Sequence, residues 1–228
     1  MLKALIFDVD GTLAETESIH LQAFNRAFKH HHLPWHWDEP LYFELLKTTG
    51  GKERILKYAR DYLKSPDVPS KQRVAQIHAT KTGYYVELVK NGALTLRSGV
   101  QKLMDEAVQD NLTLAIATTT SRANVDALCQ SIWNQPTDKI FSVVACGDEV
   151  PAKKPAPDVY ELALRRLALK ASECVALEDS ENGLASAHAA GLSTVVVPSR
   201  FSLDNGFCQA SLRAQHFTDF ALADLSQL

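Results

Sequence analysis

The fold is decided by the stretch LKALIFDVDGTL, residues 2–13. Five of the six residues from Leu2 to Phe7 are apolar, and polar residues follow them abruptly. Such a run is typical of a strand that is buried on both faces of a parallel sheet. Asp8 and Asp10 would then lie at the carboxyl end of this strand, where open α/β sheets bind their ligands.

The spacing of these two acids is informative in itself. Two close carboxylates repel each other, so Asp8 and Asp10 predict either a cation between them or a proton on one of them. Gly11 would let the backbone turn sharply just beyond. An Asx-turn after an ordinary strand would give the same residues, and the pair alone does not separate the two interpretations.

The composition limits the classes of protein to which the chain can belong. Its 228 residues, 46% of them apolar, suffice for one large domain or for a core with a smaller insert. We expect no membrane span, because no apolar run approaches about 18 residues, and no signal peptide. The four cysteines have no Cys-x-x-Cys spacing, which favours reduced thiols in a cytoplasmic protein. A net charge of -3 argues against nucleic acid as the main partner.

Periodicity divides the chain into two kinds of segment. Apolar residues recur at helical spacing in the stretches 19–28, 41–46, 55–63 and 74–88, with breaks at Leu33–Pro34, at Glu39–Pro40 and from Ser65–Pro66 to Pro69–Ser70. Beyond residue 90, expected strands at 112–117, 141–146, 174–177 and 194–197 alternate with helices, among them 125–133 and 160–167. We therefore expect an α/β protein with a doubly wound parallel sheet built from residues 1–15 and 91–228, and an inserted all-helical domain of residues 16–90.

Four histidines gather near one of the helix breaks: His30, His31, His32 and His36. Histidine is a common metal ligand, so a metal site is one interpretation of this group. No ligand spacing is evident, however, and an exposed loop is the favoured interpretation.

Hydroxyl residues follow the expected strand that ends at Ala117. They are Thr118, Thr119, Thr120 and Ser121, with Arg122 and Asn124 just beyond. Hydroxyls placed ahead of a helix can bind a phosphoryl oxygen together with backbone N–H groups. Ser and Thr are also preferred helix N-caps, which explains the same string without a ligand.

Two charged strings complete the polar set. In Lys153-Lys154-Pro155-Ala156-Pro157-Asp158, the lysine before a proline is held in extended backbone that can aim its ammonium, although the prolines could simply mark a helix start. Glu178 and Asp179 follow the strand that begins at Cys174. Adjacent carboxylates there suit Mg²⁺, but a helix N-terminus also attracts acids.

Together, these four strings resemble the four motifs of the haloacid dehalogenase (HAD) superfamily of phosphohydrolases. They occur in the right order, each at the end of an expected strand, and Lys154 rather than Lys153 takes the lysine position. The resemblance implies a HAD Rossmann-like core with a helical cap and Mg²⁺ as cofactor. It implies Asp8 as nucleophile, Asp10 as acid and base, and Thr118 and Lys154 as phosphate-binding residues. Asp8, Asp179 and the main-chain oxygen of Asp10 would hold the metal, with Glu178 beside them.

A narrower resemblance rests on the helical insert. Glu17, His20, the string from Thr48 to Arg54, and the pair His78 and Lys81 are similar to those of the CbbY-like phosphatases. Those enzymes remove the 1-phosphate of xylulose 1,5-bisphosphate, an inhibitory by-product of Rubisco. The resemblance implies that Glu17 and His20 lie near the sugar hydroxyls. The distal phosphate and sugar would be held by Gly50, Gly51, Lys52, Glu53, Arg54, His78 and Lys81, over a floor of Thr118, Thr119, Thr120, Ser121, Arg122 and Asn124.

Three alternatives remain open at this point. A β-phosphoglucomutase shares the core motifs and the cap, and a general sugar monophosphatase or phosphoglycolate phosphatase would share them as well. A non-catalytic binding module would require the loss of a core motif residue, and none is lost. As partners we expect a small phosphorylated sugar, with neither nucleic acid nor membrane. We expect a monomer in the cytoplasm, or in the plastid stroma if a transit peptide was removed.

Overall fold

A computed structural model describes residues 1–64, 68–92, 94–202 and 206–228 of the chain. The chain divides into two compact units, Met1–Glu15 with Leu94–Leu228 and Thr16–Ala93, which we call the core unit and the helical unit. The predicted break at Ser65–Pro66 lies outside the described residues. Ser70, at the end of the same predicted break, caps a helix by accepting a hydrogen bond from the backbone N–H of Arg73.

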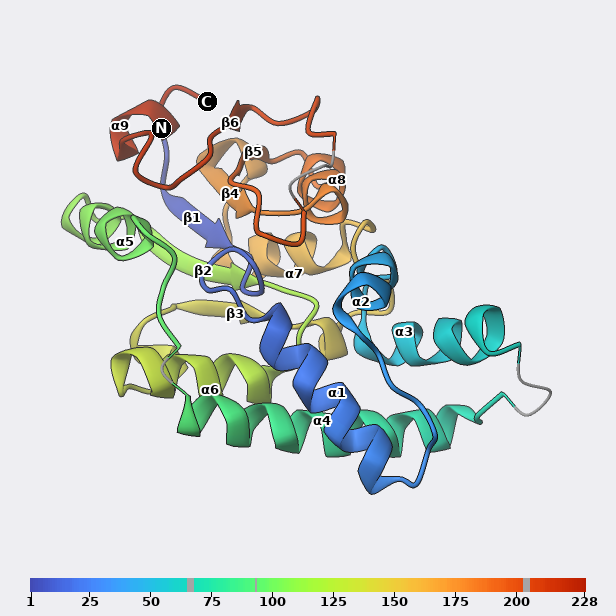
Figure 1. The fold of residues 1–228 in the computed structure, drawn as a ribbon. Coiled ribbons are helices and arrows are strands. Elements are labelled where there is room, and N and C mark those ends of the chain that lie inside the picture. Colours follow the sequence, from blue (N-terminus) through green and yellow to red (C-terminus); the bar gives the residue numbers. More distant parts are fainter. Residues whose placement is uncertain (65–67, 93, 203–205) are drawn as a thin grey trace. The chain divides into compact units, whose positions relative to one another are not determined.

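Within the described residues, the core unit contains a parallel sheet of six strands in the order β3-β2-β1-β4-β5-β6 (Figure 1). The strands are β1 Ala4–Phe7, β2 Thr113–Ala117, β3 Val143–Ala145, β4 Cys174–Glu178, β5 Ser193–Val196 and β6 Leu212–Arg213. The first strand of the sequence lies inside the sheet, where Phe7 is in register with Ile116 of β2 and Leu177 of β4. Every residue of β1 is buried, as its apolar run predicts.

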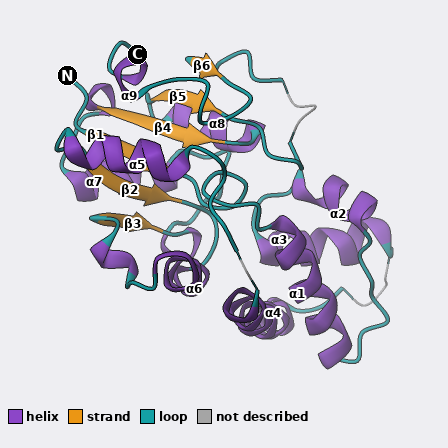
Figure 2. Cartoon of the chain, turned by 60° about the vertical axis from the view of Figure 1, so that its left-hand side comes forward, coloured by secondary structure: helices purple, strands orange, loops and turns teal. Residues whose placement is uncertain are grey.

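Helices cover both faces of this sheet (Figure 2). Leu5 and Phe7 of β1 face the layer formed by α5 Val100–Gln109, α6 Arg122–Trp133 and α9 Leu222–Leu225. Ala4 and Ile6 face α7 Asp158–Leu167, which with α8 Glu181–Ala189 forms the opposite layer. Alternate residues of one strand thus serve two cores, and the predicted doubly wound α/β sheet is confirmed.

Short turns connect these elements of the core unit. They are the 3-10 helices η2 Thr137–Lys139, η3 Gly147–Glu149 and η4 Ala171–Glu173.

The four cysteines of the chain are free, and Cys208 is the exposed one. Burial raises the pKa of the Cys129 thiol to about 11, so this thiol stays protonated at neutral pH. None of the described helices is both long and apolar enough to cross a membrane.

The helical unit is built around aromatic side chains. Its helices are α1 Glu17–His30, α2 Glu39–Leu46, α3 Gly51–Lys57, the π-helix η1 Tyr58–Tyr62 and α4 Lys71–Asn91, and they lie where helical periodicity predicts them. The ring of Trp37 lies 4.7 Å from that of Phe24 and 4.8 Å from that of Phe28, measured between centroids. All three are buried. Large rings supply much apolar area to a unit that has few residues with which to build a core.

The position of β1 makes its side chains critical for stability. We expect Leu5→Ala to lower the free energy of unfolding by about 2–5 kcal/mol, because Leu5 is fully buried against the α5 layer and its truncation leaves a cavity. Val108→Ala, which removes apolar atoms from a side chain that is 58% exposed, is the control and should change it by about 0.5 kcal/mol or less. Urea unfolding measures the free energy of unfolding of both variants, and equal losses would contradict the burial of Leu5 in the core.

Candidate active site

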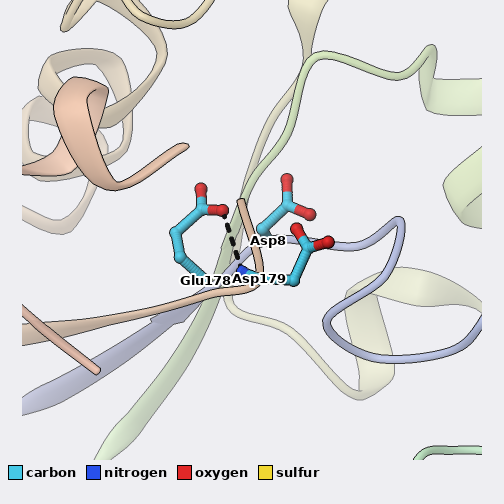
Figure 3. A group of neighbouring side chains, drawn as sticks. All are labelled: Asp8, Glu178 and Asp179. Carbon is cyan, nitrogen blue, oxygen red and sulfur yellow. Dashed lines mark hydrogen bonds between the residues drawn. The ribbon is translucent and has the colours of Figure 1, made fainter. Parts of the chain in front are cut away.

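Three carboxylates meet at the ends of two neighbouring strands (Figure 3). Asp8 follows β1, Glu178 ends β4, and Asp179 comes next. Because Phe7 and Leu177 are partners in the parallel ladder, the residues that follow them lie side by side. One oxygen from each of the three carboxylates lies within 4.8 Å of the others, and all three residues are buried. We call this group the acidic cluster.

A buried lysine contacts two members of the acidic cluster. The ammonium of Lys154 donates to Asp8 Oδ1 at 2.7 Å, to Glu178 Oε1 at 2.6 Å and to the main-chain oxygen of Ala117 at 2.9 Å. Its three donors therefore link β1, β4 and β2. Burial alone would lower the pKa of Lys154, but the two carboxylates outweigh it and hold the pKa above its ordinary value. The neighbouring Lys153 instead donates to the main-chain oxygen of Gly147.

The acidic cluster carries more negative charge than Lys154 neutralises. Burial raises the pKa of Asp8 well above its ordinary value, Lys154 opposes this effect, and the charges of Glu178, Asp179 and Asp10 add to it. A second cation would relieve the excess. Oxygen ligands of this kind are those that Mg²⁺ prefers, so the residues present fit a magnesium site. Asp8, Glu178 and Asp179 are the side chains that could hold the ion.

Asp10 differs from its partner in the first motif. It is half-buried, and its carboxylate does not belong to the acidic cluster. Its charge nevertheless contributes to the raised pKa of Asp8, so the two groups are within electrostatic reach.

Tyr160 is a member of the site that sequence reasoning treated only as an apolar position of a helix. Its hydroxyl donates to Glu178 Oε1 at 2.6 Å, and its ring centroid lies 4.9 Å from the ammonium of Lys154. A Cβ at Gly183 would overlap the Glu178 carboxylate, so glycine leaves room for that side chain. A buried tyrosine hydroxyl needs a partner, and that requirement was the available signal for Tyr160.

Hydrogen bonds connect several of the polar residues that follow β2. Thr118 is buried, and its Oγ1 accepts from the backbone N–H of Thr120 at 3.2 Å, while Asn124 donates to Thr120 Oγ1 at 2.8 Å. Ser121 begins α6, and its hydroxyl makes no capping bond. Ser121 Oγ and Asn124 Oδ1 are buried atoms without a hydrogen-bond partner among the described residues. Thr119 is half-buried.

The structure places Arg122 differently from the other members of that string. Its side chain is 46% exposed, and its guanidinium donates to Asp126 and Asp138, each at 2.8 Å. Both pairs lie on the surface of the core unit, where each ion pair contributes little to stability. The guanidinium of Arg122 is thus engaged with surface carboxylates of the core unit, and its predicted contact with substrate stays a prediction.

The predicted residues of the helical unit form two groups within that unit. In the first, Lys81 Nζ lies 2.7 Å from His20 Nδ1, and the His20 ring stacks on Tyr85 with centroids 4.2 Å apart. In the second, Tyr42 donates to Glu17 Oε2 at 2.6 Å and Arg54 donates to the Tyr42 hydroxyl oxygen at 3.0 Å. Tyr42 was not anticipated as a member of either group.

The paired glycines lie at the start of α3. Gly50 has φ of 93°, a value that favours glycine, and the carboxylate of Glu53 lies against its Cα. A Cβ at Gly51 would lie 2.6 Å from His78 Nε2, so Gly51 and His78 are in close contact. Lys52 is half-buried, and Glu53 is exposed.

The four histidines do not form a metal centre in the part of the chain that the structure describes. The acidic cluster is the group of potential metal ligands found there, and it includes none of them. His31 Nε2 lies 2.8 Å from Thr80 Oγ1, and His30 Nδ1 lies 3.2 Å from the Tyr84 hydroxyl. His32 and His36 are exposed, in agreement with the loop interpretation.

Comparison with known proteins identifies the family. The sequence model of the haloacid dehalogenase-like hydrolase family matches residues 5–197 of the chain. The chain belongs to this family. The protein CbbY of Rhodobacter capsulatus is 50% identical over 227 residues, which cover 100% of this chain and 99% of that relative. The predicted resemblance to HAD and CbbY-like proteins is therefore confirmed, and the protein is a phosphatase of the HAD family.

Two solved structures extend the comparison. A CbbY variant from Rhodobacter sphaeroides, in complex with xylulose 1,5-bisphosphate, has a TM-score of 0.93 and 44% identity, with 99% of each chain covered. The β-phosphoglucomutase of Clostridium difficile has a TM-score of 0.81 and 20% identity, over 100% of this chain and 96% of that one. At that identity, the likeness to the mutase is one of fold alone.

The raised pKa of Asp8 predicts how the metal-free protein responds to pH. A carboxyl whose folded pKa lies above its unfolded value of about 3.9 loses stability as the pH rises from that value toward the folded pKa. Asp8→Asn removes this loss. In the presence of a chelator, we therefore expect the difference in unfolding free energy between the variant and the wild type to shift in favour of the variant as the pH rises above about 4, on top of a cost for the lost contact with Lys154.

The control for this experiment is Glu161→Gln, which changes a carboxylate that is 50% exposed on α7. Its effect on unfolding should be small at every pH, because exposed ion pairs contribute little. A difference for Asp8→Asn that stays constant with pH, or that shifts in favour of the wild type as the pH rises, would contradict the raised pKa of Asp8.

Proposed function

We propose that this phosphatase is Mg²⁺-dependent, forms an aspartyl-phosphate on Asp8, and converts xylulose 1,5-bisphosphate to xylulose 5-phosphate and phosphate. The observation that carries the mechanism is the buried acidic cluster with Lys154 bonded to two of its members. The substrate is supported by the 44% identity and 0.93 TM-score to a CbbY variant whose crystal structure contains that bisphosphate.

The metal would be held by Asp8, Asp179 and the main-chain oxygen of Asp10. Glu178 would remain beside it, because its Oε1 already accepts from Lys154 and Tyr160. When bound, Mg²⁺ would neutralise negative charge on the carboxylates and on the phosphoryl group.

The first half of the reaction uses the two acids of the first motif. Lys154 and the hydroxyl of Thr118 hold the phosphoryl oxygens. An oxygen of Asp8 attacks phosphorus and forms a new P–O bond while the bond to the sugar oxygen breaks. Asp10 donates a proton to that leaving oxygen, which departs with the electron pair of the broken bond.

The second half of the reaction restores the enzyme. Water attacks phosphorus, and Asp10, now ionised, accepts a proton from it. The bond between phosphorus and Asp8 breaks, the Asp8 carboxylate is regenerated and phosphate leaves. The raised pKa of Asp8 implies that its ionised, nucleophilic form depends on positive charge nearby.

The helical unit offers cations for a second phosphate. Lys81 and Arg54 are 4% and 8% exposed, and both lie against aromatic rings: Lys81 Nζ is 4.8 Å from the Phe24 centroid, and Arg54 Cζ is 5.1 Å from that of Tyr42. Cations held in apolar surroundings act strongly on an anion, because little water screens them. His20, Glu17 and His78 supply further polar groups that would contact the sugar and the distal phosphate.

A substrate panel tests this function. Phosphate release in Mg²⁺ should be fastest with xylulose 1,5-bisphosphate, slower with xylulose 5-phosphate, glucose 1-phosphate and phosphoglycolate, and lower by several orders of magnitude in Asp8→Asn, which lacks the nucleophile. Equal rates on monophosphates would overturn the substrate but leave the phosphatase. Conversion of glucose 1-phosphate to glucose 6-phosphate without net phosphate release would indicate a mutase instead.

Paired glycine variants test the role of the helical unit. Gly51→Ala places a Cβ 2.6 Å from His78 Nε2, so His78 must move. We expect the KM for xylulose 1,5-bisphosphate to rise about tenfold or more with a smaller change in kcat, because a displaced binding group weakens ground-state and transition-state binding alike.

Gly83→Ala on α4 is the matched control. A Cβ there meets no atom within 4 Å, and alanine favours a helix over glycine by about 1 kcal/mol, so KM should not change. If Gly51→Ala leaves KM unchanged too, the contact between Gly51 and His78 has no part in substrate binding.

A further inference from the structure

A buried arginine outside the four motifs joins two loops of the core unit. The guanidinium of Arg97 donates to the main-chain oxygens of Gly11 at 2.5 Å, Val197 at 2.7 Å and Pro198 at 2.8 Å. Its own backbone N–H donates to the main-chain oxygen of Leu13 at 2.9 Å. Arg97 therefore fastens the loop after β1 to the loop after β5.

The side chain of Arg97 is largely buried, so its guanidinium needs hydrogen-bond partners. Its side chain is 12% exposed, and Cζ lies 5.4 Å from the Phe217 ring centroid. Glu15 Oε1 lies 3.5 Å from Arg97 Nε, and the Glu15 side chain is 43% exposed. The guanidinium therefore also has a carboxylate beside it, at the surface of the core unit. A largely buried cation is costly unless its donors are satisfied. The planar fork of arginine presents donors from separate nitrogens to carbonyls of two loops, a spacing that the single nitrogen of a lysine does not reproduce.

The loop after β5 reaches the acidic cluster through a serine. Ser202 Oγ lies 2.6 Å from the main-chain oxygen of Asp179 and 3.3 Å from its Oδ2. The backbone N–H of Ser199 donates to Ser202 Oγ at 2.9 Å, and Ser202 Oγ also lies 3.0 Å from Ser199 Oγ and 3.3 Å from the main-chain oxygen of Ser199, so its shortest contact is the one to the main-chain oxygen of Asp179. Both serines are buried. Asp179 is thus held by the loop that Arg97 binds at Val197 and Pro198.

The loop after β1 touches Asp179 from another side. Gly11 has φ of +84°, and a Cβ on it would overlap Asp179 Oδ2 and approach Ser199 Cβ to 3.1 Å. Only a glycine permits that approach, and the carbonyl of this same glycine accepts from Arg97. The Asp179 carboxylate therefore lies where the two loops meet, and Arg97 binds both loops.

We infer that Arg97 and Ser202 are positioning residues that together hold the Asp179 carboxylate against Asp8, so that a divalent cation finds its ligands at a fixed separation. The inference rests on the proposed function, because it takes Asp179 as a metal ligand. Groups that hold a metal ligand in place typically change metal affinity by about 10–100-fold when removed.

The test measures binding of Mn²⁺ to the full chain without substrate, by the electron paramagnetic resonance signal of free Mn²⁺. We expect the Kd of Arg97→Met and of Ser202→Ala to rise about tenfold or more. Arg97→Lys keeps the charge but not the fork, so its Kd should rise almost as much as that of Arg97→Met. Circular dichroism establishes that each variant is folded before binding is measured.

Arg165→Met is the matched control. Arg165 is 64% exposed on α7 and pairs only loosely with Glu161, at 3.7 Å, so the Kd for Mn²⁺ should equal that of the wild type. If Arg97→Met does not fold, Ser202→Ala decides, because it removes one hydroxyl at the far end of the same set of contacts.

The outcomes separate this inference from the function on which it rests. A wild type that binds Mn²⁺, with Arg97→Met and Ser202→Ala within about twofold of it, overturns the inference and leaves the function intact. Full binding by Arg97→Lys also overturns it, since charge alone would then suffice. A wild type that binds no Mn²⁺ overturns the magnesium-dependent function and the inference together.

Discussion

The site depends on the contact between one ammonium and two carboxylates in the interior of the core unit. Lys154 bonds to Asp8 and Glu178, and its third hydrogen bond goes to the end of β2 at Ala117. These partners are neighbours only because β1 lies between β2 and β4 in a parallel sheet. Removal of one partner from a buried ion pair costs about 3–5 kcal/mol, since the other charge is left uncompensated. The charge balance of the site therefore depends on the order of the strands in the sheet.

Local sequence patterns were enough to predict five of the six described strands of the core unit, and they put Asp8, Glu178 and Asp179 at strand ends. They missed β6, Leu212–Arg213, because two residues are too few to show a period. Parallel strands place their carboxyl ends at one edge, so the polar strings after β1 and β4 had to meet there. The same reasoning could not find Arg97 or Ser202. Their partners are main-chain oxygens and a carboxylate in other loops, at a sequence separation of 86 residues for Arg97 and Gly11. Arg122 shows the converse, because its place in a motif did not predict its exposed partners, Asp126 and Asp138.

The two units divide the properties of the enzyme between them. The core unit supplies carboxylates, a lysine and hydroxyls, which any phosphoryl transfer of this type would use. The helical unit supplies buried cations among aromatic rings, with Lys81 near Phe24 and Arg54 near Tyr42. A mutase with 20% identity has the same fold, so the fold does not determine which sugar phosphate is bound. Under the proposed function, selectivity among substrates would belong to the residues of the helical unit.

The interior position of β1 also bears on how the chain matures on the ribosome. β1, which Asp8 follows, is synthesised before the helical unit, yet one of its two neighbours in the sheet, β4, ends only at Glu178. The helical unit is encoded between them, and its contacts are local enough to form while the sheet is still incomplete. A nascent chain released before β4 would carry the whole helical unit but would lack Glu178 and Asp179 of the acidic cluster. The acidic cluster can therefore form only late in translation, after β4 and Asp179 have been synthesised.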